Sequence, residues 1–196
     1  MAGKQAKILS EHQQQLMMRF LRETRYPCRN KIIFLLSVKA GLRAMEIAYL
    51  RWRNLLDADG LLSGVIIIED AGSKGKRGGR SIPMHPMIRA ELEIYMRLLG
   101  TFTPNDRVIV SERKTRGVSP GYVTTMLWLW YRDVGFVGAS SHSGRRTFIT
   151  NAARKISDCG GSIRDVQHLA GHKGLNTTQR YIEGNEEAKR RLIDML

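Results

Sequence analysis

Three short groups of residues in this chain have the types and spacings that phosphate chemistry needs. Gly41-Leu-Arg43-Ala-Met-Glu46 comes first, and His142-Ser-Gly-Arg145 and Gly171-His172, followed by Tyr181, lie in the last third of the sequence. A guanidinium matches the non-bridging oxygens of a phosphodiester, a histidine can bind them or move a proton, and a tyrosine hydroxyl can attack phosphorus. In this order, two arginines, two histidines and a tyrosine form a set for tyrosine attack on a phosphodiester.

Each arginine of the set also has an ordinary explanation. Arg43 follows a Gly-Leu that ends one predicted helix, so we expect it at the start of the next helix, with Glu46 on the same face. Taken alone, the two would form a surface ion pair worth roughly 0.2–0.5 kcal/mol. His142 and Arg145 repeat this placement at a later helix start, where the helix N-terminus favours an anion. Taken alone, they and Arg146 would form a basic helical face that contacts DNA.

Tyr181 is the candidate nucleophile. A tyrosine with a pKa near 10 is ionised to only about one part in a thousand at neutral pH, so using its oxyanion costs ~4 kcal/mol. Two arginines, a histidine and a positively charged surround reduce that cost and stabilise a pentacoordinate transition state. A lone tyrosine is otherwise a core residue, and we interpret the other five tyrosines in that way.

A glycine-rich basic segment supplies the candidate general acid. Residues 72–79 read Gly-Ser-Lys-Gly-Lys-Arg-Gly-Gly between two predicted strands, which is typical of a hairpin tip. Lys74 at this tip can reach DNA and protonate a departing 5′ oxygen. Lys76, Arg77 and Arg80 compete with it or contact phosphates, and the choice between Lys74 and Lys76 stays open.

The overall charge indicates that the phosphate belongs to a nucleic acid. The 196 residues include 32 Lys plus Arg against 18 Asp plus Glu, which gives a formal charge of +14. Contacts with phosphates release counterions, so such a surface binds DNA or RNA in a salt-dependent way. No apolar run approaches the roughly 20 residues of a membrane span, so we expect no membrane partner.

The cysteines and histidines do not have the spacing of a metal site. Cys28 and Cys159 are far apart, which indicates a reducing compartment, and we expect a cytoplasmic protein. His168 and His172 are four residues apart, but a zincin has Glu directly after the first histidine and Leu169 stands there. We therefore interpret His168 as a packing or surface residue.

The elements that must position these residues are mainly helices. Hydrophobic periodicity and capping residues predict helices over 10–22, 29–39, 43–52, 86–99, 119–134, 143–156 and 162–170. Residues 65–69 and 80–83 predict an antiparallel pair of strands. We expect the α+β class: a mostly helical single domain over residues 1–196 with a small antiparallel sheet. Residues 1–9 are expected to be disordered, and residues 185–196 to form a short tail helix.

Together, the order and spacing of these residues resemble the tyrosine recombinase (phage integrase) family over about residues 10–196. The first group resembles the family's first arginine box, Ser73-Lys74-Gly-Lys its hairpin lysine, and His142-Ser-Gly-Arg145 its second box. Leu169-Ala-Gly-His172 through Thr177-Thr-Gln-Arg-Tyr181 resembles the third box, with the tyrosine nine residues after the histidine. The resemblance implies the fold of that family's catalytic domain.

The resemblance also implies an activity: a site-specific recombinase that cleaves and rejoins double-stranded DNA through a 3′-phosphotyrosine, without metal, ATP or another cofactor. Strand exchange between paired DNA sites implies a homotetramer, and the tail at 185–196 would dock on a neighbouring protomer or fold onto its own core. Integration, excision and inversion of a DNA element are all compatible with this chemistry. The implied roles are nucleophile for Tyr181, phosphate activation for Arg43, Arg145 and His172, general acid for Lys74, and assistance from His142 and Glu46.

Two features depart from the family's pattern. Many members have His-x-Leu-Arg-His in the second box, whereas Gly144 and Arg146 stand at the Leu and second His positions here. Typical integrases also carry a separate helical core-binding domain, which the first 25 or so residues cannot form. The chain therefore resembles the short members, such as the invertases that switch fimbrial promoters, or is a catalytic fragment of a longer protein.

Two other functions share parts of this pattern. The positive charge and the missing core-binding domain also suit a non-catalytic DNA-binding module. Against this, every catalytic position of the family pattern has a residue that could act in catalysis. A type IB topoisomerase shares the chemistry, but the short chain and the Thr177-Thr-Gln-Arg-Tyr181 sequence favour the recombinases.

Overall fold

The chain divides into two compact units. A computed structural model describes residues 6–69, 79–111, 117–181, 190 and 193–194. Unit 1 comprises Met1–Phe148 and unit 2 comprises Ile149–Leu196. The division falls within helix α6, Ser143–Lys155. Each unit is described by itself below.

Unit 1 is mainly helical, as the sequence predicted. Its first helix begins where expected because Ser10 accepts a hydrogen bond from the backbone N–H of Gln13, whose side chain bonds back to the N–H of Ser10. The second helix begins two residues earlier than predicted, with proline at its first position, where a missing N–H costs nothing. Besides the start of α6, the α-helices of this unit are α1 Glu11–Arg22, α2 Pro27–Lys39, α3 Ala44–Tyr49, α4 Pro86–Leu99 and α5 Pro120–Asp133.

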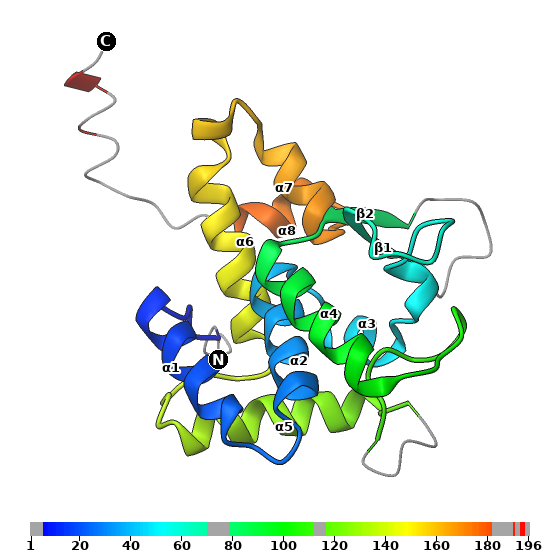
Figure 1. Ribbon diagram of the computed structural model, residues 1–196. Coiled ribbons are helices and arrows are strands. Elements are labelled where there is room, and N and C mark those ends of the chain that lie inside the picture. Colours follow the sequence, from blue (N-terminus) through cyan, green and yellow to red (C-terminus); the bar gives the residue numbers. More distant parts are fainter. Residues whose placement is uncertain (1–5, 70–78, 112–116, 182–189, 191–192, 195–196) are drawn as a thin grey trace. The chain divides into compact units, whose positions relative to one another are not determined.

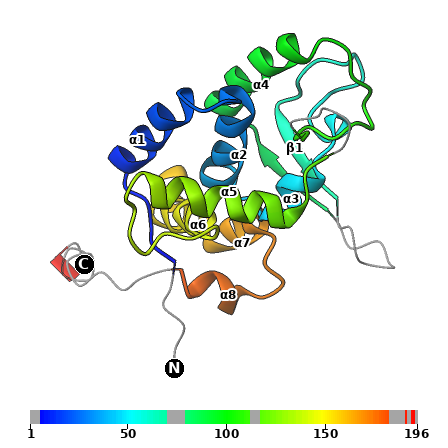
Figure 2. The same cartoon turned by 90° about the horizontal axis from the view of Figure 1, so that it is seen from below.

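Helix α2 forms the centre of unit 1. It contacts α1, α3 and α4 (Figures 1 and 2), and its segment from Ile32 to Leu36 is at most 1% exposed. A helix that is apolar on all sides is stable only when other elements surround it. The segment from Ile32 to Leu36 is therefore a central part of the core of this unit.

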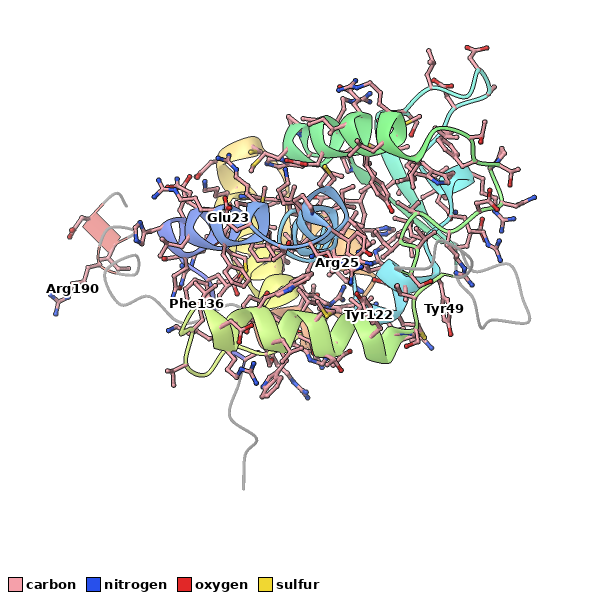
Figure 3. The ribbon with its side chains drawn as sticks, turned by 60° about the horizontal axis from the view of Figure 1, so that its bottom comes forward. Glu23, Arg25, Tyr49, Tyr122, Phe136 and Arg190 are labelled. Atoms are coloured by element: carbon pink, nitrogen blue, oxygen red, sulfur yellow. The ribbon has the colours of Figure 1, made fainter. Side chains whose placement is uncertain are left out.

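Helix α3 is shorter than the sequence predicted. It ends at Tyr49, and the chain then pairs with the segment before α5: the N–H of Val108 bonds to the carbonyl of Leu50, and the N–H of Trp52 bonds to the carbonyl of Asp106. A 3-10 turn, η1 Trp52–Asn54, follows. The predicted continuation to residue 52 is wrong because these long-range bonds replace the helical ones. Tyr49 is left 46% exposed at the helix end (Figure 3).

The small sheet is an antiparallel hairpin, as predicted. Strand β1, Val65–Ile68, pairs with β2, Arg80–Pro83, in a register that places Val65 opposite Pro83 and Ile68 opposite Arg80. Ile66 and Ile82 face each other and are buried. The basic tip between the strands, residues 70–78, lies outside the described residues.

Helix α5 is connected to the core of unit 1 through aromatic rings. Phe34 packs edge-on against Tyr131 of α5, and Tyr131 stacks with Phe136 beyond that helix. Figure 3 shows Tyr122 and Phe136 near opposite ends of α5. These rings connect α5 to α2, whereas the more extensive packing of α5 is against α3.

Unit 2 holds the third group of candidate residues. After α6 come a 3-10 turn, η2 Ser157–Cys159, and helices α7 Ile163–Ala170 and α8 Leu175–Gln179. Gly171 ends α7 in the left-handed conformation, at φ +61, so His168 and His172 do not share a helix. The sequence predicted no helix between residue 170 and the tail, whereas the structure has the short helix α8 there.

The N-terminal segment differs from the sequence-based prediction, and most of the C-terminal segment lies outside the described residues. Residues 1–9 were expected to be disordered, but Leu9 is 1% exposed and its N–H bonds to Thr147 Oγ1 at 2.8 Å. The predicted tail helix at 185–196 lies almost entirely outside the described residues. Among the helices in the described part of the chain, none is long and apolar enough to cross a membrane.

Candidate active site

Arg43 stands at the N-terminus of α3, as the sequence predicted. The chain leaves α2 through Gly41, whose φ of +65 is left-handed and whose missing Cβ leaves room for the ring of Phe148. Arg43 is the N-cap residue of α3, and its backbone N–H bonds to Glu46 Oε2 at 2.7 Å. Its side chain is 42% exposed, so its guanidinium is accessible to a ligand.

Arg145 is held beside this turn. It lies in the first turn of α6, is only 4% exposed, and its Nη1 donates to the carbonyl of Gly41 at 2.6 Å. Gly144 makes the approach of α6 to α2 possible, because a Cβ there would overlap the side chain of Ser37. The structure therefore brings the arginine of the second box to a residue two positions before Arg43.

Glu46 binds Arg43 and also a second arginine, Arg80. Its Oε1 accepts from Arg43 Nη1 at 3.0 Å and from Arg80 Nη1 at 2.8 Å, and its Oε2 accepts from Arg80 Nη2 at 2.9 Å. Burial alone raises the pKa of Glu46, but the bonds from Arg80 and Arg43 outweigh this and hold that pKa below its usual value. Glu46 is therefore a carboxylate at neutral pH.

Both legs of the hairpin are attached to the segment that carries Arg43. On the β2 leg, Arg80 binds Glu46 as described. On the β1 leg, Glu69 accepts a forked pair of bonds from Arg53 at 2.9 and 3.1 Å and a further bond from Asn54. The base of the hairpin is thus fixed relative to α3. The candidate acid Lys74 and the basic residues Lys76 and Arg77 lie outside the described residues.

His142 and Arg146 occupy different environments on either side of the helix start. His142 is exposed in the turn before α6, with its Nδ1 3.4 Å from Ser141 Oγ. Arg146 is only 8% exposed. Arg146 is thus nearly as buried as Arg145, and its predicted contact with DNA stays a prediction.

In unit 2, His172 and Tyr181 lie against each other. Their rings stack at a centroid distance of 5.5 Å and an interplanar angle of 25°. His172 Nδ1 is 2.9 Å from Thr178 Oγ1, and the backbone carbonyl of His172 accepts from Gln167 Nε2 at 3.0 Å. The backbone N–H of Tyr181 bonds to the carbonyl of Thr178. Helix α8 thereby connects the histidine to the tyrosine.

Two residues of these clusters were not recognised from the sequence in their present roles. Arg80 was predicted to contact DNA, whereas the structure pairs it with Glu46, 34 residues earlier. Thr178, which is fully buried, was quoted only as part of a motif. A predicted short helix after Gly174 could have identified Thr178 from the sequence, because such a helix places Thr178 and Tyr181 about one turn apart.

The described residues contain no group of three or more His, Cys, Asp or Glu side chains that could hold a metal ion. The chemistry of the two clusters is instead that of cations and proton carriers. Arg43 and Arg145 in unit 1 can bind a phosphate, and His172 and Tyr181 in unit 2 pair a proton carrier with a hydroxyl.

Comparison with known proteins decides the family. The profile of the Phage integrase family matches residues 7–188. The chain belongs to this family. The match includes all three groups of candidate residues, so the arginines of unit 1 and the His172–Tyr181 pair of unit 2 are parts of one family pattern.

Curated relatives of this phage integrase family member are longer proteins named tyrosine recombinases. It is 30% identical over 168 residues to the tyrosine recombinase XerA of Pyrococcus horikoshii, an alignment that covers 85% of this chain and 54% of that protein. It is also 30% identical over 159 residues to XerC of Rickettsia prowazekii, covering 79% and 47%. The chain thus spans about half the length of the relatives it matches.

Solved structures show the same fold. A crystal structure of XerA recombinase is 25% identical, with a TM-score of 0.74 over 96% of this chain and 64% of that one. The Tn1549 transposon integrase in complex with a circular intermediate DNA has a TM-score of 0.77 at 15% identity, over 100% and 67%. The predicted fold class, a mostly helical domain with a small antiparallel sheet, is confirmed.

Proposed function

We propose that this family member cleaves and rejoins double-stranded DNA at specific sites through a covalent tyrosine intermediate. Tyr181 is the nucleophile, Arg43, Arg145 and His172 bind and activate the scissile phosphate, and Lys74 is the general acid. His142 and Glu46 assist. Neither a metal ion nor ATP takes part in a step.

The reaction balances without an outside energy source. The Tyr181 hydroxyl passes its proton to the adjacent His172 imidazole as its oxygen bonds to phosphorus, and the bond from phosphorus to the 5′ oxygen breaks. Lys74 donates a proton to that 5′ oxygen, which leaves a 3′-phosphotyrosine and a free 5′-hydroxyl. The new ester retains the energy of the phosphodiester, so a 5′-hydroxyl from a partner strand can reverse the step and reseal the DNA.

The single observation that carries the proposal is the stacked pair of His172 and Tyr181. A tyrosine nucleophile needs a neighbour that can exchange its proton or bind the same phosphate, and His172 is that neighbour at 5.5 Å between ring centroids. The exposed guanidinium of Arg43 and the fixed Arg145 add phosphate-binding groups in unit 1. Relatives named tyrosine recombinases support the same activity.

We also propose the DNA substrate, the number of protein copies and the recombination products. The substrate is double-stranded DNA in the cytoplasm, and recombination of paired sites uses four copies of the chain, or of a longer protein that contains it. Integration, excision and inversion use the same strand cleavage. The structures of DNA-bound neighbours, including a lambda integrase dimer on a core site, support DNA as the partner.

Covalent trapping tests the proposal directly. The protein is incubated with nicked suicide duplexes made from the DNA that flanks its own gene, and the products are run on a denaturing gel beside Tyr181→Phe. We expect a shifted, protease-sensitive DNA band for the wild type and none for Tyr181→Phe, because the variant lacks the attacking oxygen. Tyr49→Phe is the matched control, since Tyr49 is the exposed tyrosine of α3 and has no role in the proposed step.

Three results would contradict the proposal. A covalent band that persists in Tyr181→Phe would mean that another residue is the nucleophile. Binding in a native gel with no covalent band from any flanking duplex would favour a DNA-binding module. Relaxation of supercoiled plasmids without a recognition site would instead indicate a topoisomerase.

A further inference from the structure

A single carboxylate, that of Glu46, holds two arginines of unit 1 at once. Besides the three side-chain bonds to Arg43 and Arg80, its Oε2 accepts from the backbone N–H of Arg43. A carboxylate offers about four lone-pair positions, and four donors occupy them here. Glu46 therefore has no further acceptor position, and any change at one arginine alters its bonds to the other.

The two arginines differ in burial. The side chains of Arg80 and Glu46 are 11% and 12% exposed, whereas that of Arg43 is 42% exposed. Arg80 makes a parallel, two-bond contact with the carboxylate, which is the strongest and most directional form of this pair. Arg80 thus fixes the position of Glu46 from the buried side, and Glu46 presents Arg43 on the solvent side.

The charges of the three residues explain why a second arginine is useful. Arg43 and Glu46 alone would cancel, and a neutral pair attracts a phosphate only weakly. Arg80 adds one positive charge to the group, so the cluster keeps a net positive charge while Glu46 still orients Arg43. The benefit to an incoming phosphate comes from charge as well as from geometry.

We infer that Arg80 is a positioning residue for phosphate binding at Arg43: it satisfies Glu46 so that the charge of Arg43 remains available to the DNA. This inference deepens the proposed function and depends on Arg43 being a phosphate-binding residue of that site. Arg80 acts through Glu46 and does not itself contact DNA.

The charges of the cluster predict that the effects of substituting Arg80 and Glu46 are not additive. Arg80→Gln keeps a hydrogen-bonding side chain but removes the charge, so the cluster becomes neutral and both DNA affinity and cleavage fall. Glu46→Gln in the wild-type background also lowers cleavage, because it weakens the bonds that orient Arg43. In the Arg80→Gln background, however, Glu46→Gln removes the charge that cancels Arg43, so it raises affinity and cleavage.

The experiment measures the four members of this cycle in two ways. Single-turnover formation of the covalent adduct is followed on the nicked duplexes, and affinity is followed by fluorescence anisotropy of the same duplexes in the Tyr181→Phe background. We expect adduct formation to fall about 10- to 100-fold in Arg80→Gln. This is the typical loss when a residue that orients a ligand-binding side chain is removed. Adding Glu46→Gln should recover about threefold or more in both measurements, a factor equivalent to about 0.7 kcal/mol.

Two further variants distinguish the effect of the charge at residue 80 from misfolding and from a change in the total charge of the protein. Arg80→Lys keeps the charge and loses the forked contact, so it should retain most of the affinity that Arg80→Gln loses. Arg97→Gln removes one exposed charge from α4 and should change neither measurement by more than about twofold, as exposed sites far from a contact act weakly. Thermal unfolding of every variant identifies any that does not fold, and in that case Arg80→Lys decides.

The outcomes are distinguishable. A double variant that is as poor as the product of the two single variants, or an Arg80→Lys as poor as Arg80→Gln, would overturn the inference. If the wild type forms no adduct, the proposed cleavage fails, while the affinity cycle still decides the role of Arg80. A wild type that binds no duplex would overturn both.

Discussion

At the scale of single residues, the contact between Thr178 and His172 determines how the histidine can work. A hydrogen bond between a ring nitrogen and a hydroxyl fixes the orientation of the imidazole ring. Thr178 is fully buried, so its hydroxyl has no competing water. The Thr178 contact is therefore the means by which α8 aims the imidazole beside Tyr181.

The first prediction concerns this contact. Thr178→Val keeps the β-branched shape but removes the partner of His172 Nδ1, so the imidazole can rotate away from its working orientation. Adduct formation should fall about 10- to 100-fold, the typical loss for a group that orients a histidine. The rate is measured by single-turnover trapping on the nicked duplexes across pH 6 to 9, since a freed imidazole also changes the pH profile.

Thr177→Val is the matched control for this change. Thr177 is the exposed neighbour in the same helix, so its substitution alters helix propensity equally without touching His172. Equal rates and pH profiles for Thr178→Val and the wild type would show that the hydroxyl does not position the histidine.

At the scale of elements, the start of α6 is fixed by close packing against α2. Gly144 lies at the second position of α6, where its missing Cβ makes room for the buried Ser37. A side chain at this position would displace Ser37, so the close approach of α6 to α2 requires the glycine. Arg145 follows directly and bonds to Gly41 at the end of α2, so the packing of these helices sets the placement of both arginines.

The second prediction uses two glycines in equivalent positions. Gly→Ala within a helix ordinarily stabilises by roughly 0.5–1 kcal/mol. Gly121, also the second residue of its helix, has only ordinary van der Waals contact with Ser119 Oγ, so Gly121→Ala should show that gain. Gly144→Ala should instead lower the free energy of unfolding by about 1–3 kcal/mol, because overpacking displaces Ser37.

Denaturant unfolding of both variants checks this difference, with adduct formation as a second readout. The loss of stability in Gly144→Ala should be accompanied by a loss of cleavage, since Arg145 moves with the helix. Stabilisation of both variants would mean that α6 can shift away from α2 without cost.

At the scale of the whole molecule, a net charge of +14 is carried by a chain that spans about half the length of the curated relatives it matches. The first arginine group lies in unit 1 and the His172–Tyr181 pair lies in unit 2. Each DNA contact made by either unit adds to affinity through released counterions. The salt dependence of binding therefore counts the cations that reach DNA.

The third prediction is the slope of that dependence. Five cations are expected at phosphates, namely Arg43, Arg145, Lys74, Lys76 and Arg77. Each adds about 0.9 to the slope, so log affinity against log salt should have a slope of about −4.5. Replacing the three hairpin cations by glutamine should reduce it to about −2.

The control replaces three exposed arginines outside the site: Arg19, Arg22 and Arg97. It removes the same charge, and its slope should stay near the wild-type value. A control that loses as much slope as the hairpin variant would mean that charge acts through the whole surface rather than through the predicted contacts.

The sequence alone was sufficient for the features that depend on neighbours along the chain. Apolar periodicity predicted α1, α4 and α7, because a helix buries one face at a spacing of about 3.6 residues. The N-cap at Ser10, the helix stop at Gly171 and the start of α3 at Arg43 follow from local backbone chemistry. The order of the three boxes gave the family, which the comparisons confirm.

Only the tertiary structure decided the features that depend on residues far apart in the chain. The early end of α3 comes from bonds to the segment near Val108, and the partner of Glu46 lies on a strand that follows a hairpin. No local pattern encodes such contacts, since a charged residue next to a glycine-rich loop reads equally as a DNA contact or as an ion pair. The sequence thus determined which residues form the site, whereas the folded chain determined that Arg80 supports Glu46 and that Thr178 holds His172, because these contacts exist only once distant segments pack together.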